Sequence, residues 1–354
     1  MRLIRSIQAY RGFAALLVVA FHSNLIAGEY FNQTIVSQFF SFGHSGVPFF
    51  FVLSGFIIYF VHQGDIGRPE RAATYLQKRV IRIYPVYWVV TLAVVPVYYL
   101  VPSFGSDYHR DFVALLFSLV LLPQDHYPHL AVAWTLVHEM LFYLLFALLI
   151  LRQGIGRAVF IVWMGATVIA VLGQNLGLVT LSFPATFFLS VYNSLFGLGV
   201  LASWLLSNDT ATLQRMRYPA FIAGNLLFIA AGCIENYWTG RHDGVIALFG
   251  IAAFLLVVSA GDERVERLFA GRELLQLLGN ASYSIYLTHY LTVSILGKVV
   301  QLAGITGVLP DLVTWALLFV VATVVGVVFY KLVERPLLQL CRQLLLRRNT
   351  KRLA

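Results

Sequence analysis

Two polar residues interrupt the first long apolar run of the chain, SIQAYRGFAALLVVAFH. Arg11 and His22 lie eleven positions apart in this run. An α-helix turns by 100° per residue, so the two side chains return to within about 20° of one face, with a rise of about 16 Å between them. A guanidinium can hold a phosphate or a carboxylate, and an imidazole can take a proton from a hydroxyl group near neutral pH. The spacing predicts one wall of a cavity, with a cation at one level and a base at another. The structural alternatives are an arginine that extends to a membrane interface and a histidine that bonds a neighbouring helix.

Glu139 lies in another apolar run, WTLVHEMLFYLLF, at a depth that we expect to match that of His22. A carboxylate there could fix the tautomer of the histidine, stabilise its protonated form or bind an incoming hydroxyl group. The structural alternative is a hydrogen bond to Tyr143, one helical turn away. We predict His22 and Glu139 as the catalytic residues.

Arg79 and Arg82 belong to a basic stretch, PERAATYLQKRVIRIYP, and are spaced i, i+3 on one predicted helical face. The fork of a guanidinium matches the oxygens of a phosphate, so two of them suit a polyphosphate. Basic helices beside a membrane also bind anionic lipid without any further role. With Arg11, which could hold a phosphate or a carboxylate, these residues form a predicted anion-binding site.

A polar stripe is predicted within the segment SYSIYLTH, where Ser282, Tyr286 and His289 are spaced i, i+4, i+7. Such a stripe could contact a substrate, or it could hold neighbouring membrane helices together. Together with Tyr143, the three residues are the candidate substrate contacts.

Composition identifies the surroundings of these residues. Of the 354 residues, 59% are hydrophobic and 12% are charged, whereas a soluble protein has about 25% charged residues. This excludes a pair of soluble domains. An aromatic content of 15% excludes a disordered chain, and two isolated cysteines exclude both a disulfide framework and a cysteine-based metal site.

Apolar segments of about 20 residues, the length that spans a bilayer, recur along the whole chain. We predict an all-α, polytopic membrane bundle of about ten transmembrane helices, with an integral membrane domain at 1–340 and a basic cytoplasmic tail at 341–354. An eleventh apolar stretch, 111–123, is too short to span and is predicted as a re-entrant or interfacial helix. The predicted spans are 7–27, 44–62, 82–101, 131–151, 157–173, 183–206, 218–234, 243–260, 281–303 and 311–333.

The basic residues predict the orientation of these spans. With ten spans and a cytoplasmic N-terminus, only Arg110, Arg241 and Lys298 fall outside or near the outer ends, and the other basic residues face the cytoplasm. The C-terminus is then cytoplasmic too, and the net charge of +9 reflects topology rather than a nucleic-acid partner. The first apolar segment has no small-residue cleavage site after it, so we expect an uncleaved helix in the inner (plasma) membrane.

Motifs for other chemistries do not occur in the sequence: there is no GxxxxGK[ST] phosphate loop, no HExxH and no GxSxG elbow. This argues against an NTP-driven pump, a zinc protease and a serine hydrolase. No metal site and no permanently bound cofactor are predicted.

The order of these segments resembles the acyltransferase 3 family, in particular its exopolysaccharide-acetylating branch. The resemblance covers essentially the whole chain and is carried by Arg11 and His22 in their run, KRVIRIYP, WTLVHEMLFYLL and SYSIYLTH, together with GVPFFFVLSGFIIY at 46–59 and ERP at 334–336. It implies O-acyl transfer, usually of acetyl from acetyl-CoA, to a carbohydrate hydroxyl, with the three arginines on the donor side and His22 in the chemistry.

Two departures from the family pattern limit what the resemblance implies. Many members have Asp where this chain has Pro48, so no acid is carried over to that position. Many also carry an extracellular hydrolase-like domain, whereas this sequence ends soon after its last predicted span. We therefore expect the protein to act alone on its final acceptor.

The hypothesis from the sequence is that His22 removes the proton of a sugar hydroxyl as it attacks the thioester, with Glu139 orienting or charge-balancing the imidazole. An acyl-enzyme route stays open, as does the acceptor: a polysaccharide repeat, a lipid-linked glycan, another surface oligosaccharide or a glycosylated small molecule. The rival functions are a transporter or flippase for a lipid-linked glycan and a non-catalytic membrane subunit.

Overall fold

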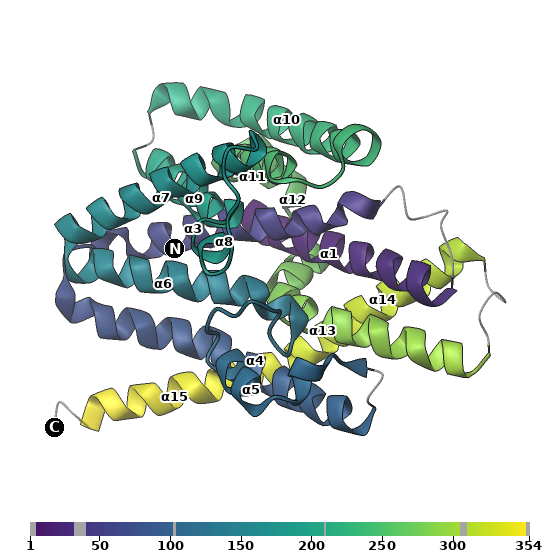
Figure 1. The fold of residues 1–354 in the computed structure, drawn as a ribbon. Coiled ribbons are helices and arrows are strands. Elements are labelled where there is room, and N and C mark those ends of the chain that lie inside the picture. Colours follow the sequence, from purple (N-terminus) through teal and green to yellow (C-terminus); the bar gives the residue numbers. More distant parts are fainter. Residues whose placement is uncertain (1–4, 32–39, 102–103, 209, 305–309, 352–354) are drawn as a thin grey trace.

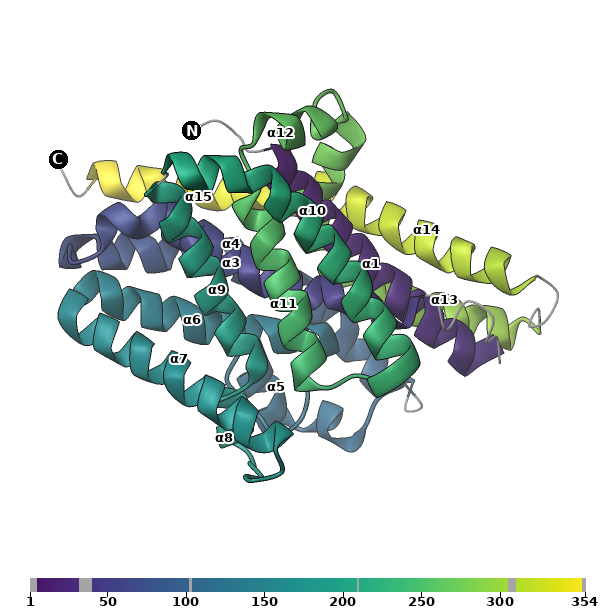
Figure 2. The same ribbon diagram turned by 90° about the horizontal axis from the view of Figure 1, so that it is seen from above.

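A computed structural model describes residues 5–31, 40–101, 104–208, 210–304 and 310–351. The described chain is helical throughout, and its long helices run roughly along one direction as a bundle (Figure 1). The N-terminal end of α1 and the C-terminal end of α15 both point to the left in Figures 1 and 2. The long helices are α1 (Arg5–Phe31), α3 (Gly46–His62), α4 (Ala72–Leu100), α6 (Trp134–Leu151), α7 (Gln153–Asn175), α9 (Val191–Ser207), α10 (Ala211–Ile234), α11 (Asp243–Val258), α13 (Glu273–Leu302), α14 (Asp311–Phe329) and α15 (Arg335–Lys351).

Nine of the ten predicted spans lie mainly on a single helix from α1 to α14, and the span predicted at 183–206 covers α8 (Ala185–Phe188) and α9. By length and apolar composition, eight helices among the described residues can cross a membrane. A ninth span is possible if α11 and α12 (Glu263–Phe269), which are bent by 99° relative to each other, count as one. The protein is thus a polytopic membrane helical bundle.

α13 is 30 residues long, but its composition is not apolar enough for it to count among the helices that can cross a membrane. Its polar side chains lower its apolar character, and they include Ser282, Ser284 and His289, all fully buried. α13 packs along α1 and α14, which shield these groups. A polar helix can lie within a membrane bundle when its neighbours cover its polar face.

The boundaries of several predicted segments differ from the helices observed, and two differences concern the site. α4 begins at Ala72 rather than at residue 82, so the basic stretch is the first part of this long helix and not a separate one. The segment predicted at 183–206 contains a break between α8 (Ala185–Phe188) and α9. There the side chain of Ser190 caps the N-terminus of α9 by accepting a hydrogen bond from Tyr192 N.

The short apolar stretch 111–123 forms the eight-residue helix α5 (Phe112–Leu119), as predicted for a helix that does not span the membrane. At the other end of the chain, α14 leads into a π-helical turn, η8 (Tyr330–Glu334), and then directly into α15. Residues 341–351 of the predicted tail are therefore the second part of a helix.

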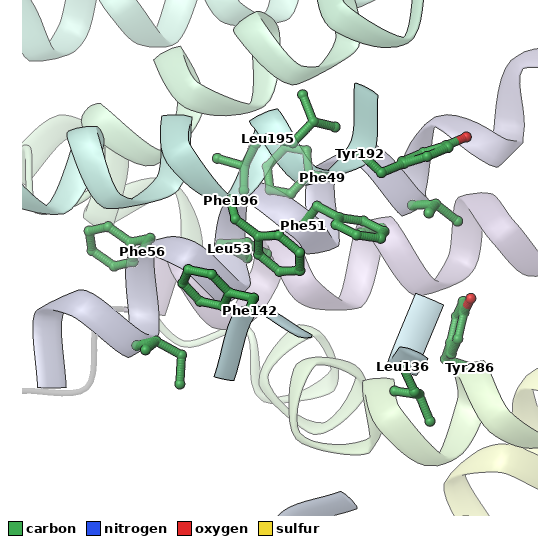
Figure 3. Packing of buried hydrophobic residues seen from close by; sticks show 14 of the residues in the cluster. Phe49, Phe51, Leu53, Phe56, Leu136, Phe142, Tyr192, Leu195, Phe196 and Tyr286 are labelled. Atoms are coloured by element: carbon green, nitrogen blue, oxygen red, sulfur yellow. The ribbon is translucent and has the colours of Figure 1, made fainter. Parts of the chain in front are cut away.

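Aromatic side chains from α3, α6 and α9 form the densest part of the core (Figure 3). The ring of Phe196 lies 4.8 Å from that of Phe51 and stacks on Phe142 at 4.4 Å. α1 and α13 approach closely at another place, where a Cβ on Gly279 would lie 2.0 Å from the backbone oxygen of Gln8. Such small residues allow two membrane helices to bring their backbones together.

Candidate active site

A cavity of about 670 Å³ opens among α1, α3, α4, α6, α9, α13 and α15. Its inner walls are apolar and include Phe51, Leu136 and Phe196, which belong to the buried cluster drawn in Figure 3. Among the described residues, five cationic side chains line it, against one carboxylate, Glu139. Cavities of this size, with apolar walls and a few polar groups, hold small-molecule ligands, and the excess of cations favours an anionic one. The cations are Arg11, Lys78, Arg79, Arg82 and Arg342.

Arg11, Arg79 and Arg82 were predicted to act together, and the structure brings all three to this one cavity. Arg11 comes from α1, while the other two are neighbours on the face of α4. The i, i+3 spacing has this result because α4 continues as one helix through both positions.

Arg79 is the arginine of the α4 pair that is available to an anion. Its guanidinium carbon lies 5.9 Å from the ring centre of Tyr75 and 5.8 Å from that of Tyr143. Its Nε is buried and has no hydrogen-bond partner, and Arg79 forms no ion pair with a carboxylate of the described chain. Two aromatic faces thus hold a cation without neutralising it.

Arg82 is neutralised by a residue that the sequence did not single out. Its Nη1 donates to Oε1 of Glu334 at 2.5 Å, and its guanidinium carbon lies 5.0 Å from the ring of Tyr283. Glu334 is 1% exposed and also accepts a hydrogen bond of 2.6 Å from Ser284 Oγ. In the sequence, the ERP segment at 334–336 contributed only to the family resemblance, and no role was predicted for Glu334. The signal was an acidic residue at the boundary of an apolar run, and the π-helical turn η8 is what places it inside the bundle.

Glu139 faces the cavity, as part of α6. Its Oε1 accepts hydrogen bonds from Ser54 Oγ, at 2.9 Å, and from the hydroxyl of Tyr143. Among the described residues, no hydrogen bond joins Glu139 to the imidazole of His22, whose Nδ1 has Val18 and His289 as partners. The hydrogen bond from Tyr143 that the sequence left as an alternative is present.

His22 lies just beyond the cavity and is not one of its lining residues. Its Nδ1 is 3.0 Å from the carbonyl oxygen of Val18, one helical turn earlier, and 3.1 Å from Nε2 of His289. The rings of Phe21 and Tyr290 pack edge-on against it at 5.0 and 5.1 Å. Of the predicted groups, His289 is therefore the one that touches His22.

The predicted polar stripe on α13 divides between the cavity and His22. Ser282 and Tyr286 line the cavity, and the Oγ of Ser282 is buried without a hydrogen-bond partner. The hydroxyl of Tyr286 donates to the carbonyl oxygen of Val132 at 2.9 Å and lies 3.0 Å from Thr135 Oγ1. His289 lies one turn further along the helix. α13 thus connects the wall of the cavity to the histidine pair.

A cluster of histidine and tyrosine rings stabilises the connection between α4 and α6. His129 is fully buried there, with Nδ1 3.0 Å from Ser118 Oγ and Nε2 3.2 Å from the carbonyl oxygen of His109. Burial lowers the pKa of His129 to about 4 and also lowers the pKa of His109. Both rings are therefore neutral at pH 7, and acidification will weaken this connection.

Comparison with known proteins identifies the kind of chemistry. The family model for acyltransferase 3, described as an acyltransferase domain, matches residues 4–331. The chain is 28% identical over 330 residues to "Exopolysaccharide production protein ExoZ" of Rhizobium meliloti (strain 1021), covering 85% of this chain and 91% of that protein. It is 26% identical over 312 residues to "Putative acetyltransferase ORF330" of Acidianus two-tailed virus, covering 84% and 86% of the two chains. No solved structure gives a significant match.

Proposed function

Since the chain belongs to the acyltransferase 3 family and is a membrane acyltransferase, we propose that it transfers an acetyl group from acetyl-CoA to a hydroxyl group of a cell-surface or exported carbohydrate. The observation that carries this proposal is the cavity, in which Arg11, Arg79 and Arg82 meet apolar walls. Helix α13 connects it to His22, since Tyr286 lines the cavity and His289, one turn further along, contacts His22. The similarity to a protein named for exopolysaccharide production favours a carbohydrate acceptor, either a polysaccharide repeat or a lipid-linked glycan.

The donor is proposed to enter with its phosphates at the cationic side of the cavity. Lys78 and Arg342 are exposed at its mouth, whereas Arg11 and Arg79 are partly buried further in. Guanidinium groups bind phosphate oxygens through charge-assisted hydrogen bonds, and the apolar walls suit the pantetheine arm of coenzyme A. In this proposal Arg79 contacts the donor directly, and Arg82 holds the shape of the site through Glu334.

The proposed transfer is a direct displacement at the thioester carbonyl. His22 takes the proton of the acceptor hydroxyl as the oxygen bonds to the carbonyl carbon, and the carbon–sulfur bond breaks. The proton taken up by His22 then passes to the leaving thiolate, which gives free coenzyme A and returns the imidazole to its neutral form. Glu139 faces the cavity, which His22 does not line. Its negative charge is proposed to stabilise the imidazolium from a distance, without contact.

Ser282, Tyr286 and Tyr143 are proposed as substrate contacts, because all three line the cavity. The Oγ of Ser282 offers a buried polar atom that a substrate group could engage. We propose that the protein lies in the inner membrane with these arginines toward the cytoplasm, where coenzyme A is made. The distribution of basic residues supports this orientation.

Incubating the purified protein with radiolabelled acetyl-CoA and a membrane glycan extract tests the proposal. We expect the label to become covalently attached to the glycan. Transport of unlabelled glycan across a reconstituted bilayer, with no transfer of label, would instead support a transporter.

A further inference from the structure

We propose that His289 fixes the tautomer of His22, so that Nδ1 of His22 carries the hydrogen and Nε2 is the atom that accepts a proton. The proposal rests on the proposed role of His22 as a base. It gives His289 the part of a positioning residue rather than that of a substrate contact.

The hydrogen bonds of His289 determine which of its nitrogens is protonated. Nδ1 lies 2.7 Å from the carbonyl oxygen of Tyr286 and 3.2 Å from that of Ile285. Carbonyl oxygens only accept hydrogen bonds, so Nδ1 must donate and must carry the hydrogen. In a neutral imidazole the other nitrogen, Nε2, is then an acceptor.

The same reasoning applies to His22, whose Nδ1 faces two acceptors. One is the carbonyl oxygen of Val18 at 3.0 Å, and the other is Nε2 of His289 at 3.1 Å. Nδ1 of His22 must therefore be the donor to both. Only one arrangement of hydrogens satisfies the neutral pair, and it leaves Nε2 of His22 with a lone pair.

Rigid parts of the fold hold this chain of hydrogen bonds in place. Each Nδ1 is bonded to a carbonyl of its own helix, one turn earlier, in α1 and in α13. The two helices are held together by the close approach of Gly279 to Gln8. Because His289 is fully buried and does not line the cavity, it acts on the reaction only through His22.

When Nε2 of His22 takes up a proton, the imidazolium keeps its Nδ1–H bond to His289. This bond is charge-assisted in the protonated state and therefore stronger there than in the neutral state. His289 thus contributes in two ways. It selects the reactive tautomer of His22, and it stabilises the protonated ring through a hydrogen bond rather than through an ion pair.

A matched pair of substitutions separates this role from a purely structural one. In His289→Gln the side-chain amide reaches the position of Nε2, so its oxygen can accept from Nδ1 of His22. In His289→Asn the amide reaches only the position of Nδ1 and cannot contact His22. We expect kcat for acetyl transfer from acetyl-CoA to a membrane glycan extract to fall about 10- to 100-fold in the Asn variant, and to stay within about threefold of wild type in the Gln variant. Acetyl-CoA affinity should change in neither variant. Equal losses of kcat in the two variants would overturn the proposal.

Nuclear magnetic resonance of protein labelled with ¹⁵N-histidine gives a reading that does not depend on activity. The resonances of His22 are assigned by their loss in His22→Ala. We expect the wild type and the Gln variant to have a protonated Nδ1 and an unprotonated Nε2 at this residue, and the Asn variant to populate the other tautomer as well. A protonated Nε2 in the neutral wild-type protein would refute the assignment. If the wild type transferred no acetyl group, the proposed function would fail, while this measurement would still decide the tautomer.

Discussion

Arg79 and Arg82 are one helical turn apart and line the same cavity, yet the same substitution should affect them differently. Arg82 is paired with Glu334, whose carboxylate is 1% exposed. Arg79 lies between two aromatic rings and has no carboxylate partner in the described chain. We predict that Arg79→Gln weakens donor binding at almost unchanged stability, and that Arg82→Gln mainly destabilises the protein.

The expected sizes follow from these surroundings. Arg79→Gln removes a charge-assisted hydrogen bond to a donor phosphate, which contributes about 1.5–3 kcal/mol, so the Kd for acetyl-CoA should rise roughly 10- to 100-fold. Arg82→Gln leaves the carboxylate of Glu334 buried with only Ser284 as a hydrogen-bond donor. Breaking a buried ion pair in this way costs about 3–5 kcal/mol of unfolding free energy. Because Arg82 itself is partly open to the cavity, the lower end of this range is expected.

Calorimetric titration with acetyl-CoA and thermal unfolding in detergent measure the two effects. The double variant Arg82→Gln, Glu334→Gln is the control: it removes the uncompensated carboxylate, so much of the lost stability should return. An Arg79→Gln protein with wild-type affinity would refute the assignment of Arg79 to the donor. An Arg82→Gln protein that unfolds at the wild-type temperature would refute the structural role of the ion pair.

Three further predictions test other parts of the structure. Burial lowers the pKa of His129 to about 4, below its unfolded value of about 6.5. Between these two pH values the unfolded state binds more protons than the folded state. The α4–α6 connection should therefore keep its full stability above pH 6.5 and lose stability as the pH falls toward 4. Hydrogen exchange of residues 104–130 measures this, and protection that stays constant from pH 7 to 4 would contradict it. Gly279→Ala should destabilise the protein by about 1–3 kcal/mol in thermal unfolding, because the new Cβ would lie 2.0 Å from a backbone oxygen of α1. The control Gly165→Ala should not destabilise it, because a Cβ there would have no neighbour within 4 Å. Equal effects of the two substitutions would count against the close approach of α1 and α13. Glu139→Gln should lower kcat about tenfold or more at unchanged acetyl-CoA affinity, because Glu139 is the one carboxylate that lines the cavity among the described residues. An unchanged kcat would show that Glu139 has no catalytic role.

Hydrophobic length was sufficient to predict an all-helical membrane bundle. Nearly every predicted span lies on one long helix, because a run of about 20 apolar residues in a bilayer has few alternatives to a helix. Helix ends were less predictable. α4 and α13 continue into polar sequence, so their true starts at Ala72 and Glu273 lie eight to ten residues before the predicted apolar edges.

The composition of the donor site could be predicted from helical periodicity, but its pairings could not. Spacing along one helix correctly placed Arg79 beside Arg82, since both are on α4. The partners of Arg82 and His22 come from positions 252 and 267 residues away in the chain. Such contacts depend on how helices pack and, for Glu334, on a π-helical turn that no local pattern announced.

Acetyl transfer by His22→Ala is the most direct test of the proposed role of His22 as the base. The purified wild type and two variants are each incubated with radiolabelled acetyl-CoA and a membrane glycan extract. The variants are His22→Ala and the control His126→Ala, which removes a ring that packs on Tyr108 in the α4–α6 connection. We predict that His22→Ala binds acetyl-CoA as the wild type does and unfolds at a similar temperature, but transfers label at least 100-fold more slowly. The control should keep the activity of the wild type. Transfer at the wild-type rate by His22→Ala would contradict the assignment of His22 as the base.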